Sequence, residues 1–449
     1  MAAGEDQVTP RPAPEVRKTT PGKLPPVVDT MLSNGLRVLA ARKPGIPMVQ
    51  VRLRFAVTKT RDWDSGVLED IVSSTILSGT KTRSQTDIAD EMQHLGGDVY
   101  SLVDADNLFV SATCLADELD RYLALLTDVV ENAAYPDDEV ALAKAQTEQG
   151  IAIMHSQPSA RAQFAVASRV FPDHPYGRPM PTIDDVVPVS AATSRAFHRR
   201  MVRPGGALLT LVGDLPPAKM VAAAERALCN WTGGRKPPKV PGAKPIVPGP
   251  IRIVHQPGAV QTNVRLGGLG VSRGHPDFPA LTLALTILGG GFTSRLNHNL
   301  REEKGYTYGA SAGISHNVGA SILNVGADVQ TAVTAPALVE TFYELGRMAT
   351  SAVTADELVA AKRFLAGQLA MSAETQAGLA SYVTALAIAG MDVSYLRELP
   401  ASANKLSVDD VAAAAAMYLA PALLAPVLVG DADVIAEAVG RIAPVEVTD

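Results

Sequence analysis

The chain has 449 residues, of which 47% are apolar and 19% charged, with a formal net charge of −6 at neutral pH. This length is too great for a single core and fits two to four domains, while the acidic balance argues against a nucleic-acid partner. Two cysteines, Cys114 and Cys229, give neither a disulfide framework nor a CxxC metal pair, and we expect both to be buried.

The N-terminal residues 1–27 are rich in proline and small residues, so we expect a disordered arm. The arm lacks the apolar stretch of a secretory signal, and its acidic residues are untypical of a transit peptide. We therefore expect a cytoplasmic protein, with the reservation that a signal already removed would leave the same sequence.

The first clear element after the arm is a strand with period-two alternation. Its apolar residues point to one side and its polar residues to the other, which predicts two unlike faces: Val49, Val51, Leu53 and Phe55 against Gln50, Arg52 and Arg54. A helix is predicted over 67–78, a β stretch over 97–114, and an amphipathic helix from Leu119 to Val130.

An internal duplication organises the rest of the chain. Four segments recur in the same order at offsets of 211, 213, 217 and 218 residues. The matched pairs are Thr75–Gly79 with Thr286–Gly290, Val51–Leu53 with Val264–Leu266, Arg203–Asp214 with Ala420–Asp431, and Lys144 with Lys362. Chance matches would not keep one order at nearly one period, so the two halves should share a fold.

Each half reads as a strand, a helix, a β stretch, further helices and a last strand. This order lacks strict βαβ alternation, so we predict an α+β fold of two homologous α/β-sandwich domains. The expected domains are 28–232 and 251–449, and the Pro/Gly-rich segment 233–250 between them should be a semi-rigid, solvated linker. Two such lobes on a stiff strap predict a clam shell with a cavity between them.

The uncharged stretch 411–430 is as long as a membrane span. Pro421 and Pro426 interrupt it, and the repeat assigns its second part to the last strand. We therefore predict a helix, a turn and a buried strand here, and no membrane association.

A glycine-rich motif opens the second half. Gly289, Gly290, Gly291 and Phe292 precede a segment containing Arg301, Gly305 and Tyr308. Gly305 is expected to end a helix, which places Arg301 in the last helical turn and Tyr308 in the following strand. This stretch resembles the second-half signature of the pitrilysin-type (M16) metallopeptidases.

The resemblance implies roles for these residues. Arg301 and Tyr308 would be the pair that reaches a substrate held at a zinc site in a facing domain, where two donors stabilise the developing oxyanion. The residues Gly289 to Phe292 would contact the substrate peptide, since glycine allows close backbone approach. The segment His174–Pro179 also resembles the family, and we expect it to form a turn without a metal ligand.

In the first half, the segment that resembles the zinc helix of M16 enzymes has lost its ligands. Asp70, Ser73 and Ser74 stand where the family carries His-x-x-Glu-His, on one helical face. Zinc needs imidazole or thiolate ligands, and a catalytic site also needs a base. Glu148 remains at the implied third-ligand position, although a surface helical Glu is the simpler interpretation. We therefore expect no zinc in this chain.

The resemblance then implies a division of labour. The chain would be the zinc-free subunit of a heterodimeric M16B-type peptidase, whose partner subunit holds the zinc, and its substrate would be a peptide or unfolded polypeptide. The alternative is a non-enzymatic M16-like scaffold in which the Arg301/Tyr308 pair has no function.

Overall fold

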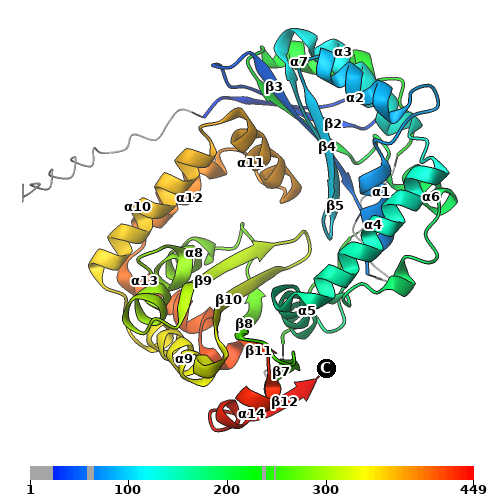
Figure 1. The fold of residues 1–449 in the computed structure, drawn as a ribbon. Coiled ribbons are helices and arrows are strands. Elements are labelled where there is room, and N and C mark those ends of the chain that lie inside the picture. The colour runs from blue at the N-terminus through cyan, green and yellow to red at the C-terminus, as the bar shows by residue number, and fades with distance from the viewer. Residues whose placement is uncertain (1–23, 58–64, 235–238, 247–248, 449) are drawn as a thin grey trace, which may run out of the picture.

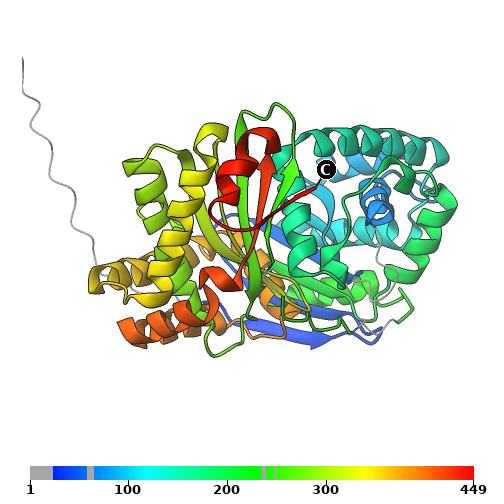
Figure 2. The same ribbon diagram turned by 90° about the horizontal axis from the view of Figure 1, so that it is seen from below.

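The computed structural model describes residues 24–57, 65–234, 239–246 and 249–448. They form two halves that follow one another along the chain and together make an open arch (Figure 1). Most of the expected N-terminal arm lies outside the described residues. Figure 2 shows the two halves side by side.

The first half is built on a six-stranded sheet with the order β1-β2-β6-β3-β5-β4. Its strands are β1 (Val27–Met31), β2 (Arg37–Arg42), β3 (Met48–Ala56), β4 (Asp98–Val103), β5 (Asn107–Leu115) and β6 (Leu208–Gly213). Among these strands β4 is an edge strand, because only β5 pairs with it.

The second half repeats this sheet with the order β12-β7-β11-β8-β10-β9. Its strands are β7 (Ile251–His255), β8 (Gln261–Gly270), β9 (Thr307–His316), β10 (Ser321–Gln330), β11 (Ala425–Gly430) and β12 (Val445–Thr448). The two sheets differ in strand direction only at the edge formed by β1 and β12: β1 runs antiparallel to β2, whereas β12 runs parallel to β7. The strand β9 occupies the edge that β4 occupies in the first sheet.

The α-helices are divided between the two halves. The first half contains α1 (Val67–Thr75), α2 (Gln85–His94), α3 (Leu119–Asn132), α4 (Asp137–Ser156), α5 (Pro158–Val170), α6 (Ala191–Met201) and α7 (Pro217–Leu228). The second contains α8 (Phe278–Leu285), α9 (Thr334–Thr350), α10 (Ala355–Ser372), α11 (Gln376–Ile388), α12 (Tyr395–Lys405), α13 (Val408–Tyr418) and α14 (Ala432–Gly440). Two π-helical segments, η4 (Thr286–Gly290) and η5 (Asn297–Glu303), follow α8.

The duplication extends to individual hydrogen bonds. Arg52 and Arg265 occupy the same place in the two sheets, since each donates to the carbonyl oxygen before it and to one on the neighbouring strand. Lys144 and Lys362 each donate to two carbonyl oxygens just before α6 and α13, respectively. The sequence repeat is therefore a structural repeat.

The halves exchange a pair of equivalent helices. Helix α5 leaves the first half and packs on β8 and β11, while α11 leaves the second half and packs on β3 and β6. The hydroxyls of Thr384 on α11 and Thr210 on β6 meet at 2.9 Å in this buried contact. This exchange explains why the polar face of β3 is also covered, with Gln50 and Arg54 both buried.

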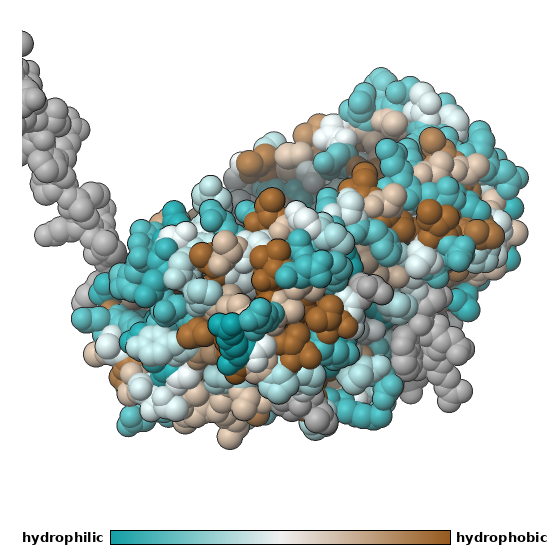
Figure 3. Space-filling model, turned by 60° about the horizontal axis from the view of Figure 1, so that its bottom comes forward, coloured by the Kyte–Doolittle hydropathy of each residue, from teal (hydrophilic) through white to brown (hydrophobic). Residues whose placement is uncertain are grey.

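The stretch 411–430 divides as predicted, into the end of α13, a turn at Pro421–Leu423 and the fully buried strand β11. No helix among the described residues is long and apolar enough to cross a membrane. On the face in Figure 3, hydrophobic residues lie in several small groups among hydrophilic ones.

Two expectations from composition need correction. The described part of the linker is not simply solvated, because Val240, Ala243 and Ile246 are partly buried in a cluster that includes residues of α5 and β11. Cys114 is buried, and burial raises the pKa of its thiol to about 12, but Cys229 is only half-buried at the end of α7.

Candidate functional site

The segment from η5 to β9 places Arg301 and Tyr308 at one end of the second sheet. The segment η5 ends at Glu303, and Gly305 adopts a left-handed φ of 64°, which turns the chain into β9. The amide of Tyr306 donates to the Leu300 carbonyl at 2.8 Å across this turn. The predicted order of helix, glycine stop and strand is confirmed.

The Arg301 guanidinium rests on an aromatic ring. Its central carbon lies 3.8 Å from the centre of the Phe292 ring, and its Nη1 lies 3.3 Å from Glu302 Oε1. A guanidinium so placed gains cation–π attraction and loses rotational freedom. The side chain as a whole keeps 30% of its exposure, whereas its Nη1 atom is buried.

Tyr308 projects into solvent from the edge strand β9. The residue is 94% exposed, and among the described residues no hydrogen bond or ion pair holds its phenol. Nor does a hydrogen bond join it to Arg301 within that part of the chain. The two side chains thus lie on elements that pack together, Tyr308 fully exposed and Arg301 partly so.

A buried asparagine fastens η5 to β9. The Asn297 side chain donates to the Ala310 carbonyl oxygen at 2.8 Å and accepts from the Ala310 amide at 3.0 Å. It also donates to the Gly291 carbonyl oxygen and to Ser294 Oγ, both at 3.1 Å. One amide therefore ties the glycine-rich turn, η5 and β9 together, two residues beyond Tyr308.

The four residues from Gly289 to Phe292 have different environments. Gly289 is buried against β9, where an added Cβ would lie 2.4 Å from the Ala312 nitrogen, so its packing requires glycine. Gly290 and Phe292 are exposed, and Gly291 is half-buried beside the Phe364 ring. Contact with a peptide remains a prediction for this segment.

A partly buried ion pair holds the same segment against α10. Arg295 donates to both carboxylate oxygens of Glu357, at 2.7 and 2.9 Å. Glu357 also accepts from the Thr354 amide and hydroxyl in the capping box of α10. The Arg295 hydrogen bond is the main cause that lowers the pKa of Glu357 to about 2.

Helix α1 places Asp70, Ser73 and Ser74 where the sequence predicted them. The Ser73 hydroxyl lies 2.8 Å from Ser101 Oγ on β4, and Ser74 Oγ donates to the Ile71 carbonyl oxygen at 3.0 Å. Helix α4, which carries the half-buried Glu148, packs against α1. Two engaged hydroxyls and two carboxylates provide no imidazole or thiolate, so these residues do not fit a catalytic zinc ion.

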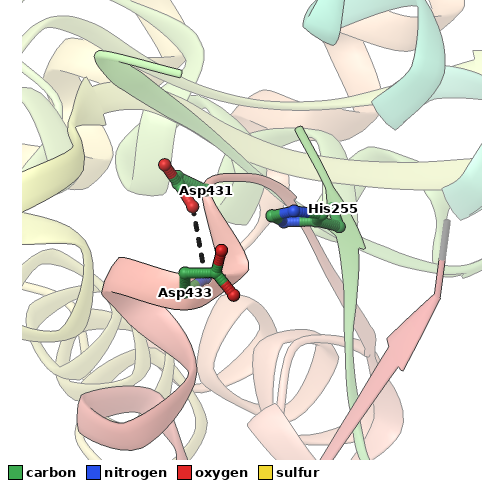
Figure 4. A group of neighbouring side chains, drawn as sticks. All are labelled: His255, Asp431 and Asp433. Carbon is green, nitrogen blue, oxygen red and sulfur yellow. Dashed lines mark hydrogen bonds between the residues drawn. The ribbon is translucent and has the colours of Figure 1, made fainter. Parts of the chain in front are cut away.

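One other cluster among the described residues has the composition of a metal site. The ligand atoms of His255, Asp431 and Asp433 lie within 4.8 Å of one another at the start of α14 (Figure 4). Asp431 accepts from the amides of Gly258 and Asp433, at 2.9 and 3.2 Å, and His255 Nδ1 accepts from the Ala432 amide at 3.0 Å. Backbone amides thus already use Asp431 and one nitrogen of the ring.

The repeat shows what this cluster does. His255 and Asp431 are the counterparts of Arg42 and Asp214, because each pair flanks the same paired glycine position of its sheet. Arg42 donates to Asp214 at 3.1 Å, and Asp214 also accepts from the Gly45 amide at 3.4 Å. We therefore interpret both clusters as structural: each binds backbone or side-chain groups where the chain leaves β6 or β11.

The sequence matches two family models. Residues 70–182 match the model described as insulinase (peptidase family M16), and residues 188–365 match the one described as peptidase M16 inactive domain. The two segments together make up more than half of the chain, which therefore belongs to the M16 peptidase family. The expected family and the expected fold of two α/β halves are confirmed.

Relatives and solved structures agree with this assignment. An uncharacterized zinc protease of Mycobacterium leprae is 28% identical over 63% of this chain and 64% of its own length, just under two thirds. A second, of Mycobacterium bovis, is 27% identical over 77% of this chain and 80% of its own length. The crystal structure of a peptidase M16 inactive domain from Pseudomonas fluorescens matches 90% of this chain and 98% of its own, with 25% identity and a TM-score of 0.83.

Proposed function

We propose that the chain is the zinc-free subunit of a heterodimeric M16 peptidase, in which it helps to bind peptide and stabilises the transition state at the zinc site of its partner. Family membership supports a role connected with peptidases. The loss of ligands on α1 supports a role without a metal of its own, because Ser73 and Ser74 bind neighbouring oxygens.

The observation that carries this proposal is the exposure of Tyr308. An aromatic side chain that is 94% exposed gains nothing from the hydrophobic effect within this chain. Tyr308 also lies beside the segment that holds Arg301, so that a substrate at this edge could meet both donors. In this mechanism the phenol O–H and the guanidinium donate to the oxyanion that forms on the scissile carbonyl.

The test begins with purification of the chain together with its partner, followed by zinc analysis of each subunit. We expect zinc in the partner alone and peptide hydrolysis by the pair alone. Tyr308→Phe should lower kcat by roughly 10²–10³, as loss of one oxyanion donor does. The matched control is Tyr343→Phe, which removes an exposed phenol from α9 and should leave the rate unchanged.

Three results would contradict the proposal. An isolated chain that hydrolyses peptides with a bound zinc ion would show that the active site is its own. An unchanged rate in Tyr308→Phe would show that the Arg301/Tyr308 pair takes no part, and a zinc-free complex without peptidase activity would favour the non-enzymatic scaffold instead.

A further inference from the structure

A cavity of about 460 Å³ lies between the two halves. Its walls come from strands β3 to β5, from helix α11, and from the β8–α8 and β9–β10 connections. Apolar residues such as Phe109 and Ile388 share these walls with polar ones. This size and mixed lining are typical of ligand sites.

Two arginines border the cavity without a carboxylate partner among the described residues. The first is Arg52, which uses three of its five N–H groups on the neutral oxygens of Val51, Ala112 and Gln50. Its counterpart in the other half, Arg265, forms an ion pair with Asp328 at 2.7 Å. The position equivalent to Asp328 in the first sheet is Thr113, so the repeat retains the arginine but not its acid.

The second arginine, Arg273, comes from the connection after β8. Its guanidinium forms no hydrogen bond or ion pair with the part of the chain that the structure describes. Burial lowers the pKa of Arg273, which shows that the charge is partly removed from water. Burial and then the Arg273 charge lower the pKa of His316 to about 4, so this neighbouring ring is neutral at pH 7.

The acids at the cavity are already engaged. Asp104 accepts from the amides of Asp106 and Asn107, both at 2.8 Å. Asp106 accepts from the Tyr176 hydroxyl at 3.0 Å and from the Val318 amide at 2.8 Å. Both carboxylates also act on the buried charge of Arg54, whose pKa burial nevertheless lowers. Arg52 and Arg273 therefore keep N–H groups that no carboxylate among the described residues binds directly.

The cavity adjoins the free edge of β4. Alternate residues of this strand, Tyr100 and Leu102, line it, while Ser101 between them faces Ser73 on α1. An extended peptide that pairs with β4 would project every second side chain over the cavity.

We propose that this cavity binds a carboxylate of an extended peptide that lies along β4, with Arg52 and Arg273 as the groups that recognise it. The inference rests on the proposed function for the peptide itself and adds a preference for acidic segments or free C-termini. Guanidinium groups suit this task because their planar N–H donors match a carboxylate.

The experiment uses the isolated full-length chain, with no partner or zinc present. Fluorescence anisotropy would measure its affinity for an N-terminally labelled hexapeptide of Val and Thr in four versions. These combine a C-terminal carboxylate or amide with Glu or Gln at the fifth position, so they separate an α-carboxylate from an acidic side chain. At least one acidic version should bind about tenfold or more tightly than the neutral one.

The variants are Arg273→Gln and Arg52→Gln, with Arg265→Gln as the matched control. The preference should disappear in Arg273→Gln, whose loop position spares the sheet, and persist in Arg265→Gln. Equal binding of all four peptides, no binding at all, or a preference that survives in Arg273→Gln would overturn the inference. A rate loss in Tyr308→Phe without any carboxylate preference would leave the proposed function intact and reject this site alone.

Discussion

Replacement of Asn297 by Ala should loosen the edge strand that carries Tyr308. In the intact protein the Asn297 amide pairs with both the N–H and the carbonyl oxygen of Ala310, as a residue of a neighbouring strand would. Both residues are buried, with exposures of 7%. Alanine would leave the two Ala310 groups without a partner and with little access to water.

The expected effect follows from these two hydrogen bonds. Net contributions of about 1 kcal/mol each, together with the desolvation of the groups left unpaired, give a loss of about 3 kcal/mol in the local stability of β9. That energy corresponds to a factor of roughly 100 in the exchange protection of the Ala310 amide. In the proposed complex, a displaced Tyr308 should also lower kcat by up to about 100-fold.

Hydrogen exchange with mass spectrometry can measure this effect on a peptide that spans 307–316. The matched control is Asn299→Ala, which removes an equally buried amide from η5 that donates to Glu340 and Glu344 on α9 instead. Exchange in β9 should rise in the Asn297 variant and remain normal in the control. Unchanged protection of β9 in Asn297→Ala, or an equal rise in both variants, would refute the reasoning.

Three further predictions concern other parts of the molecule. Burial lowers the pKa of His198 from 6.5 to about 4, so that on acidification the unfolded protein binds a proton here before the folded protein does. The free energy of unfolding of the wild type should therefore fall by about 1.4 kcal/mol per pH unit as the pH drops from 6.5 to 4. Urea unfolding at a series of pH values should show a smaller fall in the free energy of unfolding for His198→Gln. If this free energy depends on pH in the same way in both proteins, His198 is not the cause. Phe292→Ala should weaken catalysis by the proposed complex through a freer Arg301, with kcat as the readout and Phe364→Ala as control; an equal effect of both would point to general destabilisation. Chelation with EDTA should leave the thermal midpoint of the isolated chain unchanged; a fall would show a bound metal and make the cluster at His255 its candidate site.

The sequence predicts the elements of this fold well because their causes are local. Period-two alternation identified β3, and Gly305 marked the end of η5 because its left-handed φ relieves the turn before β9. The sequence repeat located the strands β6 and β11. The hydrogen bonds of Arg52 recur at Arg265. These signals lie within a few residues of the structure that they determine.

The exchange of α5 and α11 was not predicted, because an apolar helix face shows that the helix packs against something but not which sheet it packs against. Nothing local in 376–388 indicates that the covering sheet belongs to the other half. The same limit applies to Asn297, whose partner is 13 residues away, and to His255, which meets Asp431 from a distant strand. Such contacts depend on the whole topology, whereas Arg301 and Tyr308 are identified by a contiguous motif.

The crossed helices have a mechanical consequence. Because α5 packs on the second sheet and α11 on the first, a cut in the linker around 239–246 should leave the two halves associated. Either half folded alone would expose the sheet face that the other half's helix covers. A molecule braced in this way has little freedom to flex about its own middle. In the proposed complex, any opening that admits a polypeptide would then take place where this chain meets its partner.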